Sequence, residues 1–239
     1  MIKLDILAIA AHPDDAELSC SGTIASHVAK GYKVGILDLT EGEMGTRGTP
    51  AIRMEESATA AEILGLSVRE NLGFEDVFFT EEKKYQVAIA RILRKYRPEI
   101  VLANAVEDRH PDHGKGGSLV TKACFLSGLR RLETELDGVL QQPWRPKAVY
   151  HYIQNNYIEP DLVVDISAYW DIKKESILAF KSQFFDPESK EPESFISRPG
   201  FLDFIEARAR EMGHKISVTY GEGFTVERVP GVEDLMVLV

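Results

Sequence analysis

The sequence predicts an α/β fold, a Rossmann-like, doubly wound and mostly parallel sheet, in a single domain over residues 1–239. Short apolar runs alternate with longer amphipathic runs, a pattern that gives right-handed crossovers with helices on both faces of a sheet. The runs ILAIA and VGILDL are almost continuously apolar, as strands buried on both faces are. Hydrophobic residues make up 44% of the chain, which supplies a core and argues against disorder.

Each element follows from a local signal. The first apolar run predicts a strand, and the amphipathic run after it predicts a helix that Gly31 ends. A second helix has Thr49 as its N-cap, Pro50 in its first turn and Gly65 after its end. Apolar residues at a 3.6-residue period predict a third helix, which Pro98 prevents from continuing.

These signals give the following elements. Strands are expected at Leu4–Ala10, Lys33–Leu39, Val68–Leu72, Ile100–Ala103, Ala148–Ile153 and Leu162–Ile166. Helices are expected at Glu17–Lys30, Ile52–Leu64, Glu82–Tyr96, Gly117–Leu129, Asp171–Phe180 and Pro199–Arg210.

Composition excludes several classes of function. With 28 Lys and Arg against 38 Asp and Glu, the net charge is −10, so we expect no nucleic acid or membrane partner held by bulk electrostatic attraction. Two cysteines exclude a disulfide framework and a Cys-rich zinc module. No apolar stretch approaches the roughly 18 residues of a membrane span, and the N-terminus lacks a signal-peptide pattern, so we expect a cytoplasmic protein.

Two similar motifs carry the chemistry. His12-Pro13-Asp14-Asp15 follows the first strand directly, and His110-Pro111-Asp112-His113 comes shortly after the fourth. In the common doubly wound order 3-2-1-4-5, these two strands are neighbours, and ligands bind where the chain reverses direction between them. The two motifs are therefore expected to meet in one crevice.

The residue types in these motifs favour a metal over a nucleotide. The turn after the first strand has no glycine to admit a pyrophosphate, and its carboxylates would repel one. Two imidazoles and a carboxylate, from His12, Asp15 and His113, would bind a divalent metal and leave positions open for water or substrate. Asp14 would then serve as general base. His110 would stabilise an oxyanion or protonate a leaving amine, with Asp112 orienting it.

The motifs AHPDD and HPDH closely resemble those of the LmbE-like (PIG-L) family of zinc-dependent N-acetylglucosaminide deacetylases. The resemblance runs over essentially the whole chain. A further set of residues looks most like the bacillithiol-pathway branch, which deacetylates N-acetylglucosaminyl-malate. That set is Leu39–Thr49, Glu107–Arg109, Ser182–Phe184 and Gly221–Phe224.

The resemblance implies zinc, a small sugar-conjugate substrate and a homo-oligomer, hexamers being known among relatives. It gives the metal and the catalytic roles to the residues already named. Arg53 matches a substrate-binding arginine of the family, and Arg47 and Arg109 are further candidates for binding substrate carboxylates. Phe201 matches a position where some relatives carry an oxyanion-binding tyrosine, and a phenyl ring cannot donate that hydrogen bond.

Other functions stay open at this stage. Two histidines and one carboxylate also suit iron(II), so a non-haem iron oxygenase is an alternative. A non-catalytic sugar or metal binder is another, although it would need neither Asp14 nor His110. The sequence does not fix the aglycone, and deacetylation of another N-acetyl sugar conjugate is the nearest alternative.

Overall fold

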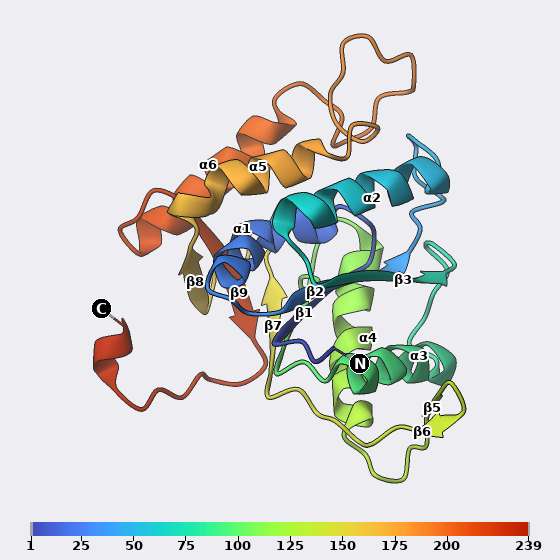
Figure 1. The fold of residues 1–239 in the computed structure, drawn as a ribbon. Helices are drawn as coiled ribbons and strands as arrows, with labels where there is room; N and C mark the ends of the chain where they lie inside the picture. The colour runs from blue at the N-terminus through green and yellow to red at the C-terminus, as the bar shows by residue number, and fades with distance from the viewer. Residues whose placement is uncertain (1, 239) are drawn as a thin grey trace.

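A computed structural model describes residues 2–238, and a seven-stranded sheet lies at its centre (Figure 1). The strand order is β3-β2-β1-β4-β7-β9-β8, in which the first five strands are parallel and β9 runs antiparallel to β7 and β8. The strands are β1 (Ile6–Ala10), β2 (Val34–Thr40), β3 (Val68–Phe74), β4 (Ile100–Ala103), β7 (Ala148–Tyr152), β8 (Leu162–Asp165) and β9 (Gly221–Val226). A separate hairpin pairs β5 (Glu135–Leu136) with β6 (Val139–Leu140).

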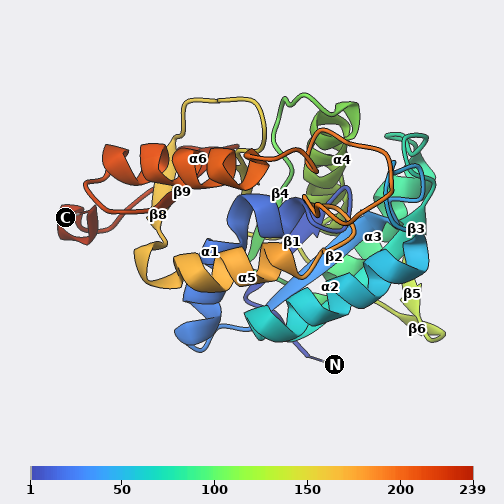
Figure 2. The same ribbon diagram turned by 90° about the horizontal axis from the view of Figure 1, so that it is seen from above.

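Helices cover both faces of this sheet (Figures 1 and 2). They are α1 (Asp15–Ala29), α2 (Pro50–Leu64), α3 (Lys83–Tyr96), α4 (Pro111–Ser127), α5 (Trp170–Leu178) and α6 (Phe201–Lys215), with 3-10 turns at Ser167–Tyr169 and Leu235–Leu238. In Figure 1, α3 and the lower part of α4 lie below the sheet, whereas α1, α2, α5 and α6 lie above it. None of the helices within residues 2–238 has the length and apolar character that a membrane crossing requires.

Alternation along β1 shows how the two cores form. Leu7 and Ile9 point to the core that α3 and α4 cover, while Ile6 and Ala8 point to the core beneath α1. Because side chains alternate across a strand, a strand that is apolar at every position must be covered on both faces. This is the doubly wound arrangement predicted from the sequence, and the fold class is confirmed.

The expected helix signals at α2 are present. Thr49 Oγ1 accepts a hydrogen bond from the Ile52 N–H at 3.3 Å, Pro50 lies at the start of the helix, and Gly65 ends it with φ 64°. A left-handed residue at that position favours glycine because no Cβ is present to clash.

Several boundaries differ from the predicted ones. Helix α4 begins at Pro111 and not at Gly117, so the second motif spans the N-cap and the first turn of this helix. The glycines at 114, 116 and 117 disfavour a helix in a prediction from sequence, so the start of α4 was placed too late. A Cβ on Gly117 would lie 2.8 Å from the Asn104 carbonyl oxygen, so close packing on the sheet requires glycine there. Strand β9 was missed because two glycines interrupt it, and the β5–β6 hairpin is too short to give a pattern.

Candidate metal centre

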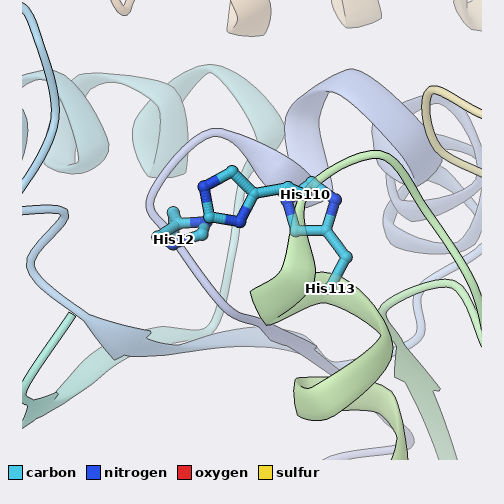
Figure 3. A group of neighbouring side chains, drawn as sticks. All are labelled: His12, His110 and His113. Carbon is cyan, nitrogen blue, oxygen red and sulfur yellow. The ribbon is translucent and has the colours of Figure 1, made fainter. Parts of the chain in front are cut away.

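The two motifs meet at the carboxyl edge of neighbouring strands β1 and β4. His12 follows β1, and Asp15 opens α1, whereas His110 is the N-cap of α4 and His113 lies in its first turn. Figure 3 shows the three imidazoles facing one another from these elements. The ring centres of His12 and His110 are 4.8 Å apart, and those of His12 and His113 are 5.7 Å apart. The structure therefore brings the predicted residues together.

The Asp15 carboxylate lies between two of these imidazoles. Its Oδ2 is 3.5 Å from His12 Nδ1, and its Oδ1 is 3.0 Å from His113 Nε2. Side-chain amides of Asn104 and Gln154 donate to the same carboxylate at 3.0 and 3.1 Å. Burial alone would raise the pKa of Asp15, but the two histidines hold it well below its ordinary value. Asp15 is thus an oriented, ionised carboxylate that could bind a metal.

The outer nitrogens of both imidazoles face further carboxylates. His12 Nε2 lies 3.0 Å from Asp76 Oδ1 and 3.4 Å from Asp112 Oδ2, and His113 Nδ1 lies 2.6 Å from Asp108 Oδ2. A metal-binding histidine commonly donates its second N–H to a carboxylate, which fixes the ring and its tautomer. Each ring therefore directs its other nitrogen towards Asp15, the orientation that two ligands of one ion would have.

The donor set fits a divalent metal. Asp15 contacts His12 Nδ1 with one carboxylate oxygen and His113 Nε2 with the other, and a catalytic metal site keeps three protein ligands with an open position. Among the described residues, His12, His110 and His113 form one cluster close enough to bind a metal, and His12, Asp76 and Asp112 form another. Imidazole with carboxylate suits zinc and also iron(II).

Asp14 lies beside this centre in a strained conformation. Its φ is 113° and ψ −23°, a region that residues with a Cβ rarely adopt, and such strain gathers at functional sites. The carboxylate is buried, with Oδ2 3.0 Å from Arg53 Nη2. Burial raises the pKa of Asp14 to about 7, against the opposing charge of Arg53. A carboxylate whose pKa lies near neutral pH is suited to accept a proton.

His110 is half-buried, and the backbone N–H of Asp112 donates to its Nδ1 at 3.3 Å. This bond leaves the ring hydrogen on Nε2. Burial, together with the nearby His12 and His113, lowers the pKa of His110. The Asp112 side chain was expected to orient His110, but its carboxylate lies against His12 and Lys115, with Lys115 Nζ 2.7 Å from its Oδ1. Helix geometry explains the difference, because residues two apart point to different sides.

A cavity of about 520 Å³ opens over the centre, and all three predicted arginines line it. Arg53 is buried, and its Nη2 also donates to the Pro13 carbonyl oxygen. Arg47 is buried, and its Nη2 donates to Ser189 Oγ at 2.8 Å. Arg109 is exposed, with its guanidinium 4.1 Å from the Phe195 ring centre. Each arginine is therefore within the cavity wall that a substrate would meet.

Sequence reasoning missed several residues of this cavity. Asp76 and Asp108 contact the imidazoles, and Gln154 holds Asp15. Each lies shortly after a parallel strand, so the topology that located the motifs could also have found them. Phe201 lies in the wall, its ring stacked on Phe184, and contributes apolar surface.

Fold and site together define a class: an α/β protein with two histidines and one carboxylate, residue types suited to bind a metal, clustered at the carboxyl edge of its sheet. Within that class, the sequence profile of the PIG-L family, described as GlcNAc-PI de-N-acetylase, matches residues 7–124. The chain belongs to this family. The family and its relatives support deacetylase activity.

Three relatives illustrate the range of the family. A diacetylchitobiose deacetylase from Thermococcus kodakarensis is 32% identical over 190 residues, which cover 75% of this chain and 70% of the relative. A 4-oxalmesaconate hydratase from Pseudomonas putida is 28% identical, covering 74% of this chain and 73% of its own. The crystal structure of a conserved protein from Thermus thermophilus superposes with a TM-score of 0.85 at 37% identity, covering 96% of this chain and 97% of that one.

Proposed function

We propose that the chain is a zinc-dependent amidohydrolase that removes the N-acetyl group from an N-acetylglucosaminide. The observation that carries this proposal is the buried acid Asp14, placed beside the cluster of His12, Asp15 and His113 at the floor of the cavity. A binding protein needs ligands for a metal but no adjacent base. The deacetylase names of relatives support the same reaction.

The roles follow from position. His12, Asp15 and His113 would hold the metal, which when bound supplies a Lewis acid and water of lowered pKa. Asp14 accepts the proton of the attacking water. His110 directs its Nε2–H to the developing oxyanion, because its Nδ1 is already occupied by the Asp112 N–H. Asp112 in turn helps to fix His12 rather than His110.

The arginines favour a substrate with an acidic aglycone. Arg47 is buried in the cavity wall, and among the described residues its Nε finds no hydrogen-bond partner. Glu191 Oε2 lies 3.6 Å from this Nε, so the N–H has a charge partner but no hydrogen bond, and a substrate oxygen would supply one. With Arg53 and Arg109 nearby, N-acetylglucosaminyl-malate, the bacillithiol precursor, is the proposed substrate, ahead of a neutral disaccharide such as diacetylchitobiose.

Water addition to an unsaturated tricarboxylate is the second candidate function. The relative named 4-oxalmesaconate hydratase favours it, and both reactions need an activated water next to groups that bind carboxylates. The two functions differ in product: deacetylation releases acetate and a free amine, whereas hydration releases neither.

The deciding experiment is a panel assay with the zinc-loaded protein. N-acetylglucosaminyl-malate, N-acetylglucosaminyl-inositol, diacetylchitobiose and an unsaturated tricarboxylate are each tested for free amine, acetate and loss of the double bond. We expect free amine, fastest with the malate conjugate. The Asp14→Asn variant is the matched control and should bind zinc but lose most turnover. Absence of amine from every N-acetyl sugar would refute the proposal, as would full activity of the variant. Oxygen consumption with iron(II) would instead indicate an oxygenase.

A further inference from the structure

Asp76 links the metal centre to the substrate-binding wall. It follows β3 and is 3% exposed. Its Oδ1 lies 3.0 Å from His12 Nε2, and its Oδ2 accepts the N–H of Met44 at 3.1 Å. The two oxygens of one carboxylate thus hold a candidate metal ligand on one side and a loop backbone on the other.

That loop, residues 41–48, forms part of the cavity wall through Met44, Gly45, Thr46 and Arg47. A second hydrogen bond joins this loop to Asp76, because Glu43 Oε1 accepts the N–H of Asp76 at 2.6 Å. Gly42, in the same loop, has φ 67° and packs against the Arg53 guanidinium. The position of Arg47 and the shape around Arg53 therefore depend on where Asp76 holds the loop.

We propose that Asp76 is a positioning residue that couples the metal ligand His12 to the substrate-binding loop 41–48. The inference rests on the proposed metal site. His12, held by a metal, would keep the Asp76 carboxylate in place, and that carboxylate accepts the Met44 N–H. Metal binding then orders the wall that receives the substrate, before any substrate arrives.

The other carboxylate of this kind provides a matched control. Asp108 contacts His113 Nδ1 at 2.6 Å, as Asp76 contacts His12, but its Oδ1 accepts the N–H of Asn156. It is thus joined to a different segment of the chain. Loss of Asp108 weakens a metal ligand in the same way without touching loop 41–48.

The experiment compares the wild-type protein, Asp76→Asn and Asp108→Asn with zinc alone. Asparagine keeps one acceptor oxygen, so Asp76→Asn can satisfy either His12 or Met44 but not both. Zinc affinity, measured by chelator competition, should fall about 10–100-fold in both variants. Hydrogen exchange of the peptide covering residues 41–48 is then followed with zinc at saturation. Zinc should slow this exchange in the wild type and in Asp108→Asn, and leave it unchanged in Asp76→Asn.

A surface variant covers the case in which Asp76→Asn does not fold. Glu43→Ala removes the exposed carboxylate that accepts the Asp76 N–H, and it leaves the Asp76–His12 contact intact. It should keep wild-type zinc affinity but lose much of the zinc-dependent protection of loop 41–48. Neither readout needs turnover, so a failure of the proposed deacetylase function would not be mistaken for a failure of the coupling.

Three results would overturn the proposal. The first is equal zinc-dependent protection of loop 41–48 in Asp76→Asn and wild type. The second is loss of that protection in Asp108→Asn as well, which would indicate general loosening. The third is a stoichiometry of two zinc ions that falls to one in Asp76→Asn, because His12, Asp76 and Asp112 would then be a second metal site.

Discussion

Replacing Arg53 by methionine tests whether Asp14 is the base and Arg53 tunes it. Arg53 Nη2 lies 3.0 Å from Asp14 Oδ2, and both side chains are buried, 5% exposed in each case. Methionine keeps most of the length and apolar volume of the arginine stem but removes the charge. The carboxylate of Asp14 then loses the nearest cation that stabilises its ionised form.

The direction and size of the effect follow from this geometry. Burial has already raised the pKa of Asp14 to about 7, and Arg53 opposes the rise. An adjacent cation lowers a carboxyl pKa by about 1–3 units, so its loss raises the pKa of Asp14 by that amount. Because only ionised Asp14 accepts a proton, the acidic limb of the pH profile moves to higher pH by about 1–3 units. A bound metal lowers this pKa in both proteins, so the comparison between them is preserved.

The assay is log(kcat/KM) against pH for the zinc-loaded wild type and Arg53→Met. Arg53 also faces the substrate, so the variant should lose activity at every pH, and the position of the limb separates the two effects. Arg47→Met is the control: it removes another buried arginine of the cavity, whose partners are Ser189 and Glu191, and should leave the limb in place. A limb that stays at the same pH in Arg53→Met would refute the assignment of Asp14 as the titrating base.

Other parts of the structure give three further predictions. Lys173→Met leaves the Glu222 carboxylate buried without the Nζ that lies 2.7 Å away, so urea denaturation should show a loss of about 3–5 kcal/mol, partly restored by adding Glu222→Gln. Gly42→Ala adds a Cβ at φ 67° that overlaps the Arg53 guanidinium, and kcat/KM should fall up to about 100-fold while the fold, checked by circular dichroism, persists. Chelation should abolish turnover, and stoichiometric zinc should restore it; activity that survives complete chelation would rule out a catalytic metal.

The central parallel strands and the residues that follow β1 and β4 could be predicted from the sequence for one reason. Strands buried on both faces must be apolar throughout, so β1, β2 and β4 stand out in the sequence. Once their order is known, the ends of β1 and β4 must be adjacent, and the motifs after them must meet. His12, Asp15 and His113 could thus be placed together without any knowledge of side-chain positions.

The supporting residues are harder to single out, although each follows a parallel strand. Asp76 and Asp108 each stand directly after a glutamate, and the sequence does not say which of the neighbouring acids contacts an imidazole. Asp112 was assigned to the wrong histidine because a motif gives proximity in sequence, whereas the first turn of α4 decides which side chain points where. The sequence-based prediction missed strand β9 because its glycines are required for close packing against neighbouring elements. That requirement comes from tertiary structure and leaves no local sequence pattern.

The candidate site lies at the carboxyl edge of the parallel strands, whereas the apolar core on both faces of the sheet stabilises the fold. The residues that follow β3, β2, β1, β4 and β7 all contribute to the site: Asp76, Arg47, His12, Asp108 and Gln154. They are held by hydrogen bonds and buried charges, whereas the sheet beneath is held by apolar packing on both faces. Because the two kinds of interaction share few residues, a substitution at the carboxyl edge should reduce turnover far more than stability. One in the apolar strands should do the reverse. The family can therefore vary its reaction, as the hydratase relative illustrates, without changing the packing that forms the fold.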